Sequence, residues 1–390
     1  MELTQYFRNF FQSSQSSGII LIICVALSLL IANSSAGESF HYFLNSSLGP
    51  YSLSVWINDG LMAVFFLLVG LEIKREIIEG ELSSFKSASL PIFAALGGML
   101  VPALIYFIFN SGTDYAKGWG IPMATDIAFS LAIISMLGRR VPASIKIFLA
   151  ALAIVDDLGA ILVIAIFYTE QIHWSYLFLS AGIMLLLVLL NYFKVTKHIF
   201  YLVPGAFLWY FMHHSGIHAT IAGVLLAFTI PTNISKEEIS PLEKLENKLH
   251  FPVNFLIMPI FALANTNIIL KNGMVDGLFT NFGMGIICGL VFGKVIGITT
   301  FSFVAIKMKI SEIPFKSNWI QMLGAGFLAG IGFTMSIFIA LLSFKGHPEI
   351  QEEAKFTILI ASAISGFIGY ILLKYFGRKK IKLSERTLAE

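Results

Sequence analysis

The stretch from Gly118 to Tyr168 restricts the fold of this chain more than any other part of the sequence. Most of its residues are apolar, yet it contains three carboxylates, Asp126, Asp156 and Asp157. A charged side chain at the centre of a bilayer costs roughly 2.5–3.5 kcal/mol on insertion scales, so three of them need a functional reason. The sequence therefore predicts that these acids face the protein interior and bind a cation that crosses the membrane.

The rest of the chain is equally apolar. Of 390 residues, 57% are hydrophobic and 13% are charged, whereas soluble domains carry about 25% charged residues. A membrane-spanning helix needs about 20 apolar residues. We predict an all-α polytopic membrane protein that forms one integral-membrane domain over residues 1–390. The expected spans are twelve: 18–33, 58–78, 89–109, 119–137, 144–168, 174–192, 199–212, 217–230, 252–270, 283–306, 319–343 and 356–376.

The basic residues predict the orientation of these spans. With the N-terminus inside, 21 of the 26 Lys and Arg residues fall in inner segments, four fall in outer ones, and Lys294 lies within a span. Cytoplasmic loops carry an excess of Lys and Arg. This bias predicts cytoplasmic N- and C-termini and an even number of spans. The small net charge of +3 gives no indication of nucleic-acid binding, and we expect neither a cofactor nor a disulfide.

Asp126 follows a helix-breaking residue. Pro122 lacks a backbone donor, and Thr125 places a hydroxyl beside the carboxylate. An interrupted helix at membrane depth is tolerated only where it is buried in protein or lines a cavity. The freed carbonyls, the hydroxyl and the carboxylate are oxygen ligands suited to a small, hard cation.

A second apolar span contains four glycines, Gly324, Gly326, Gly330 and Gly332. They are compatible with close helix packing or with a second interrupted helix. Interrupted segments at matching places in two halves of a chain indicate a transporter site. We expect spans 3–5 and 10–12 to form inverted repeats, over about 89–168 and 283–376, with discontinuous helices at spans 4 and 11 that cross near the bilayer midplane.

Asp156 and Asp157 are consecutive, so on a helix they point about 100° apart. Lys294 is the basic residue deep in a span and needs a carboxylate partner. We expect Asp157 to bind the ion and Asp156 to pair with Lys294. The alternative, a static core of ion pairs, leaves two carboxylates without a partner.

Several other polar residues lie near the span ends. Asp59 is either a helix-start acid or an accessory site on the cation path. The outer loop 34–57 is either a short hairpin or irregular. The inner charged groups, which include Glu72, Arg75, Glu246 and His250, are expected by themselves to form solvated faces. The outer histidines, which include His218, are either interfacial side chains or pH sensors.

The chain resembles the NhaA-type Na+/H+ antiporters of bacterial inner membranes. The similarity follows the whole chain in order through these stretches: NDGLMAVFFLLVGLEIKRE (58–76), GWGIPMATDIAFS (118–130), KIFLAALAIVDDLGAI (146–161), GIHATIAGV (216–224), MPIFALAN (258–265), GLVFGKVIGI (289–298) and GAGFLAGIGFTMS (324–336).

This resemblance implies roles for the residues at matching positions. Asp126, Thr125, Asp156 and Asp157 fall on the ion and proton site, Lys294 on the partner of Asp156, and Asp59 on an accessory acid. The pH-response positions fall on Glu72, Arg75, His218, Glu246 and His250. The sequence departs from the family pattern at Asn247, where a histidine is frequent, and at Glu243, where a basic residue is common.

The resemblance implies an electrogenic exchanger that expels Na+ or Li+ in exchange for protons at alkaline pH. The cation, held transiently at Asp157 and Asp126, and the proton compete for the same carboxylates while the repeats alternate between the two sides. The expected partners are these ions and membrane lipids. The short outer loop leaves open whether two copies form a homodimer.

Two other functions fit parts of the sequence. A proton-coupled transporter of an organic solute would need a wider cavity with aromatic or Arg contacts, and no Arg lies inside a span. An intramembrane aspartyl protease would need Tyr-Asp and Gly-x-Gly-Asp segments, which are missing around Asp126 and Asp157. We therefore expect a transporter and no enzyme activity.

Overall fold

The computed structural model describes residues 14–169, 171–232, 239–271 and 273–376. Some basic residues of the orientation argument lie outside the described residues. They are Arg8 near the N-terminus, Lys236, and the basic residues after Phe376. By their contacts, the residues group into two compact units. Unit 1 contains Met1–Ile23, Ser84–Asp157 and Leu270–Glu390, and unit 2 contains Cys24–Ser83 and Leu158–Ile269.

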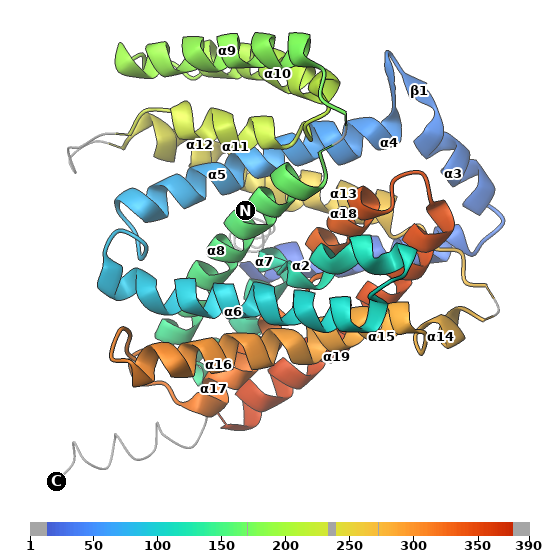
Figure 1. The fold of residues 1–390 in the computed structure, drawn as a ribbon, viewed down its shortest axis with the longest axis vertical. Coiled ribbons are helices and arrows are strands. Elements are labelled where there is room, and N and C mark those ends of the chain that lie inside the picture. The colour runs from blue at the N-terminus through green and yellow to red at the C-terminus, as the bar shows by residue number, and fades with distance from the viewer. Residues whose placement is uncertain (1–13, 170, 233–238, 272, 377–390) are drawn as a thin grey trace, which may run out of the picture. The chain divides into compact units, whose positions relative to one another are not determined.

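Unit 1 contains the helices that carry the three aspartates (Figure 1). Its elements are α6 (Phe85–Asn110), the 3-10 segment η2 (Asp114–Met123), α7 (Ile127–Met136), η3 (Gly138–Arg140), most of α8 (Ala143–Phe167), α14 (Met274–Gly277), α15 (Asn281–Ile287), the π-helical η5 (Cys288–Gly293), α16 (Lys294–Lys307), α17 (Trp319–Ala329), α18 (Phe333–Ser343) and α19 (Pro348–Phe376).

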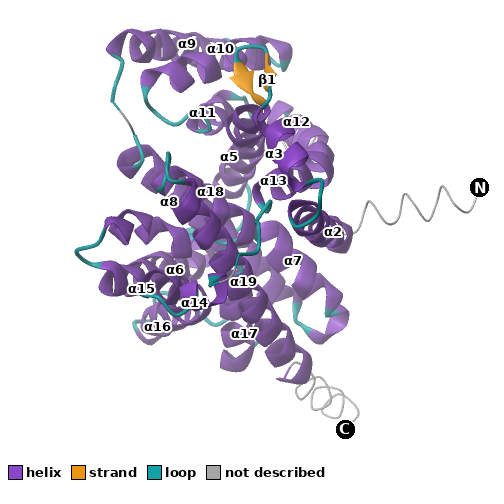
Figure 2. Cartoon of the chain, turned by 90° about the vertical axis from the view of Figure 1, so that its right-hand side faces the viewer, coloured by secondary structure: helices purple, strands orange, loops and turns teal. Residues whose placement is uncertain are grey.

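Unit 2 contains the remaining helices and the one hairpin of the described residues, whose strands are orange in Figure 2. Its elements are the C-terminal half of α2 (Ser14–Ala32), α3 (Gly37–Asn45), β1 (Ser47–Leu48), β2 (Tyr51–Ser52), α4 (Leu53–Val55), the π-helical η1 (Trp56–Leu61), α5 (Met62–Ile78), α9 (Trp174–Tyr192), α10 (Ile199–Ser215), α11 (Ile221–Thr229), α12 (Pro241–Pro252), the π-helical η4 (Val253–Ile257) and α13 (Met258–Asn265).

Within the described ranges, seven helices are long and apolar enough to cross a bilayer, or up to nine if each of two bent pairs forms one span. The bent pairs are η2 with α7, at 41°, and α17 with α18, at 45°. The other three expected spans fall on α10, α11 and η4–α13, which do not reach that length as single α-helices. The structure therefore shows a polytopic helical protein, and the count of twelve stays a prediction.

The long helices follow from the apolar sequence, because a chain in hydrocarbon must satisfy its backbone donors and acceptors internally. Side chains fix several helix starts. The Ser84 hydroxyl accepts from Ser87 N at the start of α6, and Asn318 and Gln321 form a capping box at the start of α17. In unit 1, α6 packs along α16 so closely that a Cβ on Gly97 would lie 2.2 Å from the Gly297 carbonyl oxygen (Figure 1).

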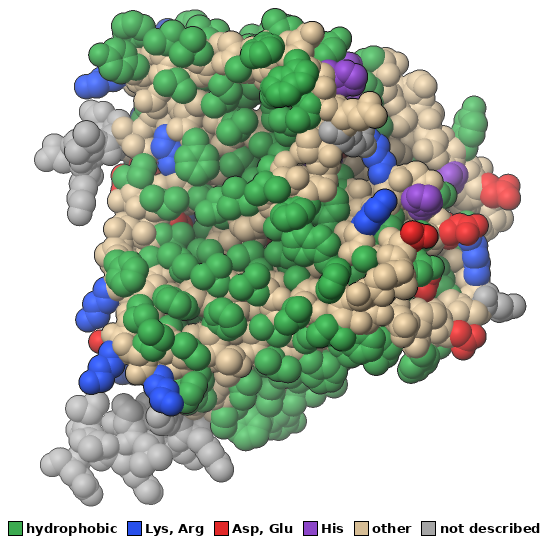
Figure 3. All heavy atoms as spheres, viewed as in Figure 1, with side chains coloured by type: hydrophobic (Ala, Val, Ile, Leu, Met, Phe, Trp, Pro, Cys, Tyr) green, Lys and Arg blue, Asp and Glu red, His purple; other side chains and the backbone are tan. Residues whose placement is uncertain are grey.

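The surface of unit 2 agrees with a lipid environment. Hydrophobic side chains cover α9, at the top of Figure 3. Phe178, Leu185 and Tyr192 on this helix are 71%, 62% and 77% exposed. Contiguous exposed apolar surface of this kind is rare on soluble monomers and is typical of a protein that contacts a membrane.

The loop 34–57 contains a short hairpin, one of the two alternatives that the sequence left open. β1 and β2 are antiparallel, with Ser47 opposite Ser52 and Leu48 opposite Tyr51. Gly49 has φ +69°, which a glycine adopts without strain, and Pro50 completes the two-residue turn. The turn composition therefore explains why so short a hairpin forms here.

Candidate functional site

Asp126 lies where one helical segment stops and another begins. η2 ends at Met123, just after Pro122, and Ala124 has an extended backbone before α7 begins at Ile127. Asp126 is the N-cap of α7, because its Oδ1 accepts a hydrogen bond of 3.0 Å from Phe129 N. The proline break thus converts this acid from a mid-helix side chain into a helix cap.

A second interruption meets Asp126 from the other half of unit 1. α17 ends at Ala329 and α18 begins at Phe333. The Thr334 backbone N–H donates to Asp126 Oδ2 over 3.1 Å, and the Thr334 hydroxyl donates to the same oxygen. In return, Asp126 N donates to the Ile331 carbonyl over 2.7 Å. The Asp126 carboxylate therefore lies at the N-terminal, positive ends of both α7 and α18, which stabilise an anion.

Asp156 and Lys294 form an ion pair in the interior of unit 1. Lys294 Nζ lies 2.5 Å from Asp156 Oδ2, and both side chains are 0% exposed. This is the pairing expected from the sequence. The other oxygen of Asp156, Oδ1, is buried without a hydrogen-bond partner among the described residues. A buried pair of this kind depends on both partners, because removing one leaves an uncompensated charge.

Thr125 differs from its expected place. Its hydroxyl lies at Asp156 rather than beside the neighbouring Asp126: Thr125 Oγ1 is 2.7 Å from Asp156 Oδ2 and 2.8 Å from the Ala329 carbonyl oxygen. The extended backbone at Ala124 explains the difference, since consecutive side chains then point in opposite directions. Thr125 thus connects the Asp156–Lys294 pair with the end of α17.

Asp157 follows Asp156 on α8 and is 2% exposed, so both acids of this dipeptide are buried. The described residues contain no group of three His, Cys, Asp or Glu side chains placed to hold a metal ion together. Asp126 and Asp156 both accept hydrogen bonds from protein donors here. A cation that binds these oxygens must therefore compete with Thr334 and Lys294.

The glycines of the second interrupted segment have different surroundings. Gly330 and Gly332 flank the interruption, whereas Gly324 and Gly326 lie inside α17 and not in a break as the sequence argument expected. A Cβ on Gly324 would lie 2.7 Å from Leu373 Cγ, so this glycine allows α19 to pack closely. Both interpretations of this glycine-rich span therefore apply, each to different glycines. Gly324 allows close helix packing, whereas Gly330 and Gly332 lie at the interruption.

The charged residues that the sequence predicts on the inner side form a cluster around Arg75 in unit 2. Arg75 Nε lies 3.0 and 3.1 Å from the two carboxylate oxygens of Glu246, and Arg75 Nη1 lies 2.9 Å from Glu76. The Arg75 and Glu246 side chains are 34% and 13% exposed, so water reaches this pair. Glu72, one turn earlier on α5, interacts electrostatically with Arg75 and Glu246.

Two other residues of this region have a local role. His250 lies on the exposed side of α12, with ring nitrogens 3.3 Å from Asn254 Nδ2. Glu243 closes a capping box at the start of α12: its Oε2 accepts from Ser240 N over 2.8 Å, and Ser240 Oγ accepts from Glu243 N over 3.1 Å. These backbone and side-chain bonds to Ser240 lower the pKa of the Glu243 carboxyl group. The acid at this position is thus explained by helix capping.

Asp59 lies in η1, where two imidazoles face its carboxylate. His213 Nδ1 is 3.3 Å from Asp59 Oδ2, and His218 Nε2 is 3.6 Å from Asp59 Oδ1. The sequence argument singled out Asp59 and His218. It did not pair Asp59 with His213, because α10 brings that residue back to η1 only in the folded chain.

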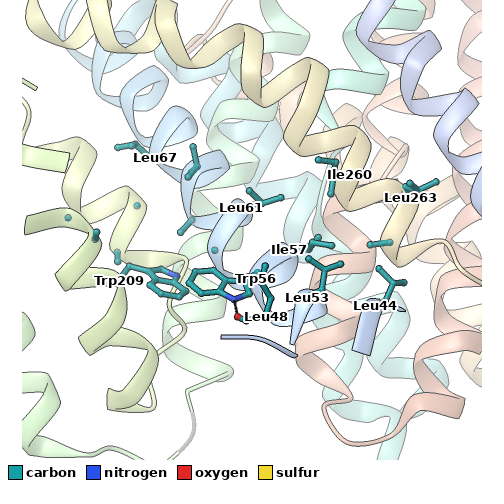
Figure 4. Close-up of a pocket in the computed structure, with 18 of the residues that line it drawn as sticks. Leu44, Leu48, Leu53, Trp56, Ile57, Leu61, Leu67, Trp209, Ile260 and Leu263 are labelled. Atoms are coloured by element: carbon teal, nitrogen blue, oxygen red, sulfur yellow. Dashed lines mark hydrogen bonds between the residues drawn. The ribbon is translucent and has the colours of Figure 1, made fainter. Parts of the chain in front are cut away.

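Unit 2 also contains an apolar groove of about 750 Å³ (Figure 4). Its walls come from α3, the hairpin, α4, η1, α5, α10, α11 and α13 and include Leu48, Trp56, Leu67, Trp209 and Leu263. A cation would find little stabilisation against such walls, because apolar surface supplies no oxygen ligands. We therefore place the candidate ion site at the aspartates of unit 1.

Two residues of unit 1 and unit 2 have roles that sequence reasoning missed. Thr334 binds Asp126, and Lys74 Nζ binds the last carbonyls of α11, at 2.8 Å from Phe228 O and 2.5 Å from Ile230 O. A signal for Thr334 existed, because it stands in the glycine-rich stretch 324–336, directly after the interruption. Lys74 carried no such signal, since its partners are backbone atoms distant in sequence.

Comparisons with known proteins agree on one family. The profile of the family described as Na+/H+ antiporter 1 matches residues 8–373. A Na+/H+ antiporter NhaA 2 of Flavobacterium johnsoniae is 58% identical over 383 residues, covering 96% of this chain and 93% of the relative. Proteins named Na+/H+ antiporter NhaA from Flavobacterium psychrophilum and Dechloromonas aromatica are 52% and 51% identical, each covering 96% of this chain and 97% of the relative.

Proposed function

Because this chain belongs to the Na+/H+ antiporter 1 family, we propose that it exchanges Na+ for H+ across a bacterial inner membrane and that the buried aspartates of unit 1 perform the exchange. Relatives with these names are transporters and not enzymes, which agrees with the expected absence of a catalytic dyad. The observation that carries the proposal is the position of Asp126, held at two helix starts beside the buried Asp156–Lys294 pair.

Competition between the two ions follows from the burial of these acids. Burial favours the neutral form of a carboxyl group, whereas Na+ binds the ionised form. Asp157 and Asp126 are 2% and 1% exposed. In the proposed cycle, Na+ or Li+ binds at Asp157 and Asp126 and displaces a proton, and a proton arriving from the other side displaces the cation. Asp156, whose Oδ2 accepts from both Lys294 and Thr125, contributes the third carboxylate of the proposed site.

The two interrupted segments supply the conformational step of the proposal. We treat η2–α7 and α17–α18 as discontinuous spans 4 and 11 of two inverted repeats within about 89–168 and 283–376. Half-helix ends at membrane depth are frequent at the ion sites of secondary transporters. Small movements of these ends around Asp126 would expose the carboxylates to one side of the membrane at a time.

The remaining parts of the proposal concern the membrane arrangement and charge balance. The bias of Lys and Arg supports twelve spans with both termini in the cytoplasm. If more protons than Na+ ions cross per cycle, the exchange is electrogenic, and each net charge contributes about 2.3 kcal/mol per 100 mV. On this orientation the Arg75 cluster, with Glu72, Glu246 and His250, lies on the cytoplasmic side and adjusts activity to pH.

Everted membrane vesicles test the function. Vesicles that contain the wild-type protein should lose an imposed pH gradient when NaCl or LiCl is added, with K+ as the negative control. Asp157→Asn should abolish this response, because an amide cannot exchange a proton for a cation. Asp114→Asn, an acid in the first turn of η2, is the matched control and should retain it. Exchange that persists in Asp157→Asn would remove Asp157 from the mechanism.

A further inference from the structure

A π-helical turn directly precedes Lys294. α15, η5 and α16 follow one another without a break and form one helix of 27 residues, Asn281–Lys307 (Figure 1). In η5, the Lys294 N–H donates to the Gly289 carbonyl, five residues back, whereas an α-helix would use the Leu290 carbonyl, four residues back. The turn therefore holds one residue more than an α-helical turn. Single π turns inside α-helices are rare and are frequent at functional sites.

Two glycines of η5 bring its backbone against prolines of unit 1. A Cβ on Gly293 would lie 2.8 Å from Pro102 Cα in α6, and a Cβ on Gly289 would lie 2.6 Å from Pro122 Cβ in η2. Pro122 is the residue just before the end of η2, where the first interruption begins. The π turn therefore packs directly against the first interrupted segment.

The π turn also contacts the second interruption. A Cβ on Gly330 would lie 2.4 Å from the Leu290 carbonyl oxygen, and a Cβ on Gly332 would lie 2.8 Å from Leu290 Cδ2. The carbonyl that Lys294 N would use in an α-helix thus lies against the gap between α17 and α18. η5 therefore contacts both interruptions and directly precedes the cation that pairs with Asp156.

A π turn can occupy more than one place along a helix, because moving it changes only which carbonyl each N–H uses. A residue that the turn passes shifts by one position, about 100° around the axis and about 1.5 Å along it, while the flanking turns stay in place. Gly297 limits this movement, since a Cβ there would lie 2.0 Å from the Gly97 carbonyl oxygen and α16 is fixed against α6 from that point. Residues 294–296 are therefore the ones that can change position.

α6 offers the Lys294 ammonium a second acceptor. Pro102 has no N–H to donate to the Gly98 carbonyl, four residues earlier. A Cβ on Gly98 would lie 3.7 Å from Lys294 Cδ, so the stem of Lys294 passes this turn of α6. A backbone carbonyl at membrane depth that lacks its helical donor needs another one. The Gly98 carbonyl is thus close to Lys294 and suited to an ammonium group.

We propose that η5 positions Lys294 for the exchange. With the π turn before Lys294, the ammonium group lies on Asp156 Oδ2. When the turn moves past Lys294, the ammonium hydrogen bond transfers to the Gly98 carbonyl and Asp156 becomes available to Na+. The contact of Leu290 with Gly330 links this movement to the second interruption. The inference rests on the proposed function and adds to it the step that removes the competing cation from the site.

Deletion of Phe292 tests the proposal, because it removes one residue from the π turn and leaves an α-helix throughout. Phe292 is 52% exposed, so little packing is lost. The flanking turns keep their partners, and Lys294 stays on Asp156. We expect the purified variant to unfold near the wild-type temperature. In everted vesicles it should lose most Na+/H+ exchange and need more Na+ for its half-maximal rate.

Phe292→Ala is the matched control, since it removes the same side chain and keeps the chain length. This variant should exchange Na+ at about the wild-type rate. A folded deletion variant that exchanges at the wild-type rate would overturn the proposal. Wild-type vesicles that show no Na+ exchange would instead contradict the proposed function, which separates the two failures.

Hydrogen–deuterium exchange of the purified wild type provides a second measurement, which does not require the deletion variant to fold. Added Na+ should change deuterium uptake in a peptide that covers residues 286–298, because the π turn moves to other carbonyls there. K+ should leave the uptake unchanged. Phe292→Ala should respond like the wild type, and the deletion variant should not respond. Uptake in the wild type that is the same with Na+ and K+ would overturn the proposal.

Discussion

The Asp156–Lys294 pair of unit 1 and the Arg75–Glu246 pair of unit 2 differ mainly in how much water reaches them. The first has 0% exposure on both side chains, and the second has 34% and 13%. A buried pair cannot exchange its partner for water, so breaking it is costly, whereas a partly exposed pair contributes about 0–1 kcal/mol. Under the proposed function, the charges of unit 1 serve a binding step, whereas those of unit 2 can change with solution pH at little cost in stability.

The largest expected effect is on the buried pair. Lys294→Met leaves Asp156 without its charge partner and should destabilise the protein by about 3–5 kcal/mol, and Asp156→Asn in the same background should restore most of this loss. Thermal unfolding of the purified variants measures both. Lys86→Met, which breaks a 3.6 Å pair with side chains 82% and 81% exposed, is the control and should be close to wild type. Equal instability of the single and double variants would contradict the comparison.

The next effect concerns the packing around the interruption in unit 1. A Cβ on Gly330 would lie 2.4 Å from both the Leu290 carbonyl oxygen and Ser365 Oγ, whereas a Cβ on Gly326 would come no closer than 3.4 Å to Val295 Cα. Gly330→Ala should therefore remove most exchange activity, because backbone atoms cannot yield as a flexible side chain can. Gly326→Ala should stay within about 0.5 kcal/mol of wild type in stability. Exchange rates measured in everted vesicles test this prediction. Equal rates in the two variants would show that the surrounding structure accommodates the added Cβ at Gly330.

A smaller stability effect is expected in the exposed cluster. Arg75→Gln removes the charge between Glu246 and Glu76, which then repel each other when ionised. We expect a loss of stability of about 1 kcal/mol or less, together with a shifted pH profile of exchange. Everted vesicles assayed from pH 6.5 to 9 provide the profile. An unchanged profile in this variant would separate the cluster from pH regulation, whatever its effect on stability.

The smallest effect is expected at Glu243. Its pKa is lowered by the bonds to Ser240, so the carboxylate stabilises the start of α12 above its ordinary pKa near 4.5, and this contribution is lost as the pH falls through the lowered value. Glu243→Gln should keep the capping box and lose this pH dependence, and Glu243→Ala should lose both. Thermal unfolding between pH 4 and pH 7 distinguishes them. Identical curves for all three proteins would exclude a measurable role for the cap.

The hydrogen-bond and ion-pair partners of the candidate acids were predictable to different degrees. Lys294 was found as the partner of Asp156 because it is the one Lys or Arg deep within a predicted span, and few other groups can neutralise it there. The Thr125 hydroxyl was assigned to the wrong aspartate, because its direction depends on the extended backbone after Met123. Thr334 and His213 were missed as partners, since the contacts join residues 208 and about 150 positions apart.

The amino-acid sequence by itself determined that this protein is a polytopic helical membrane protein, because apolar runs of span length have no other stable environment. It also determined the family, and where acids and helix breakers interrupt the apolar runs. Only the tertiary structure decided which donors meet each carboxylate, because hydrogen bonds act over about 3 Å and depend on how helices distant in sequence cross. That crossing puts Asp126 at two helix starts and Asp59 between two imidazoles.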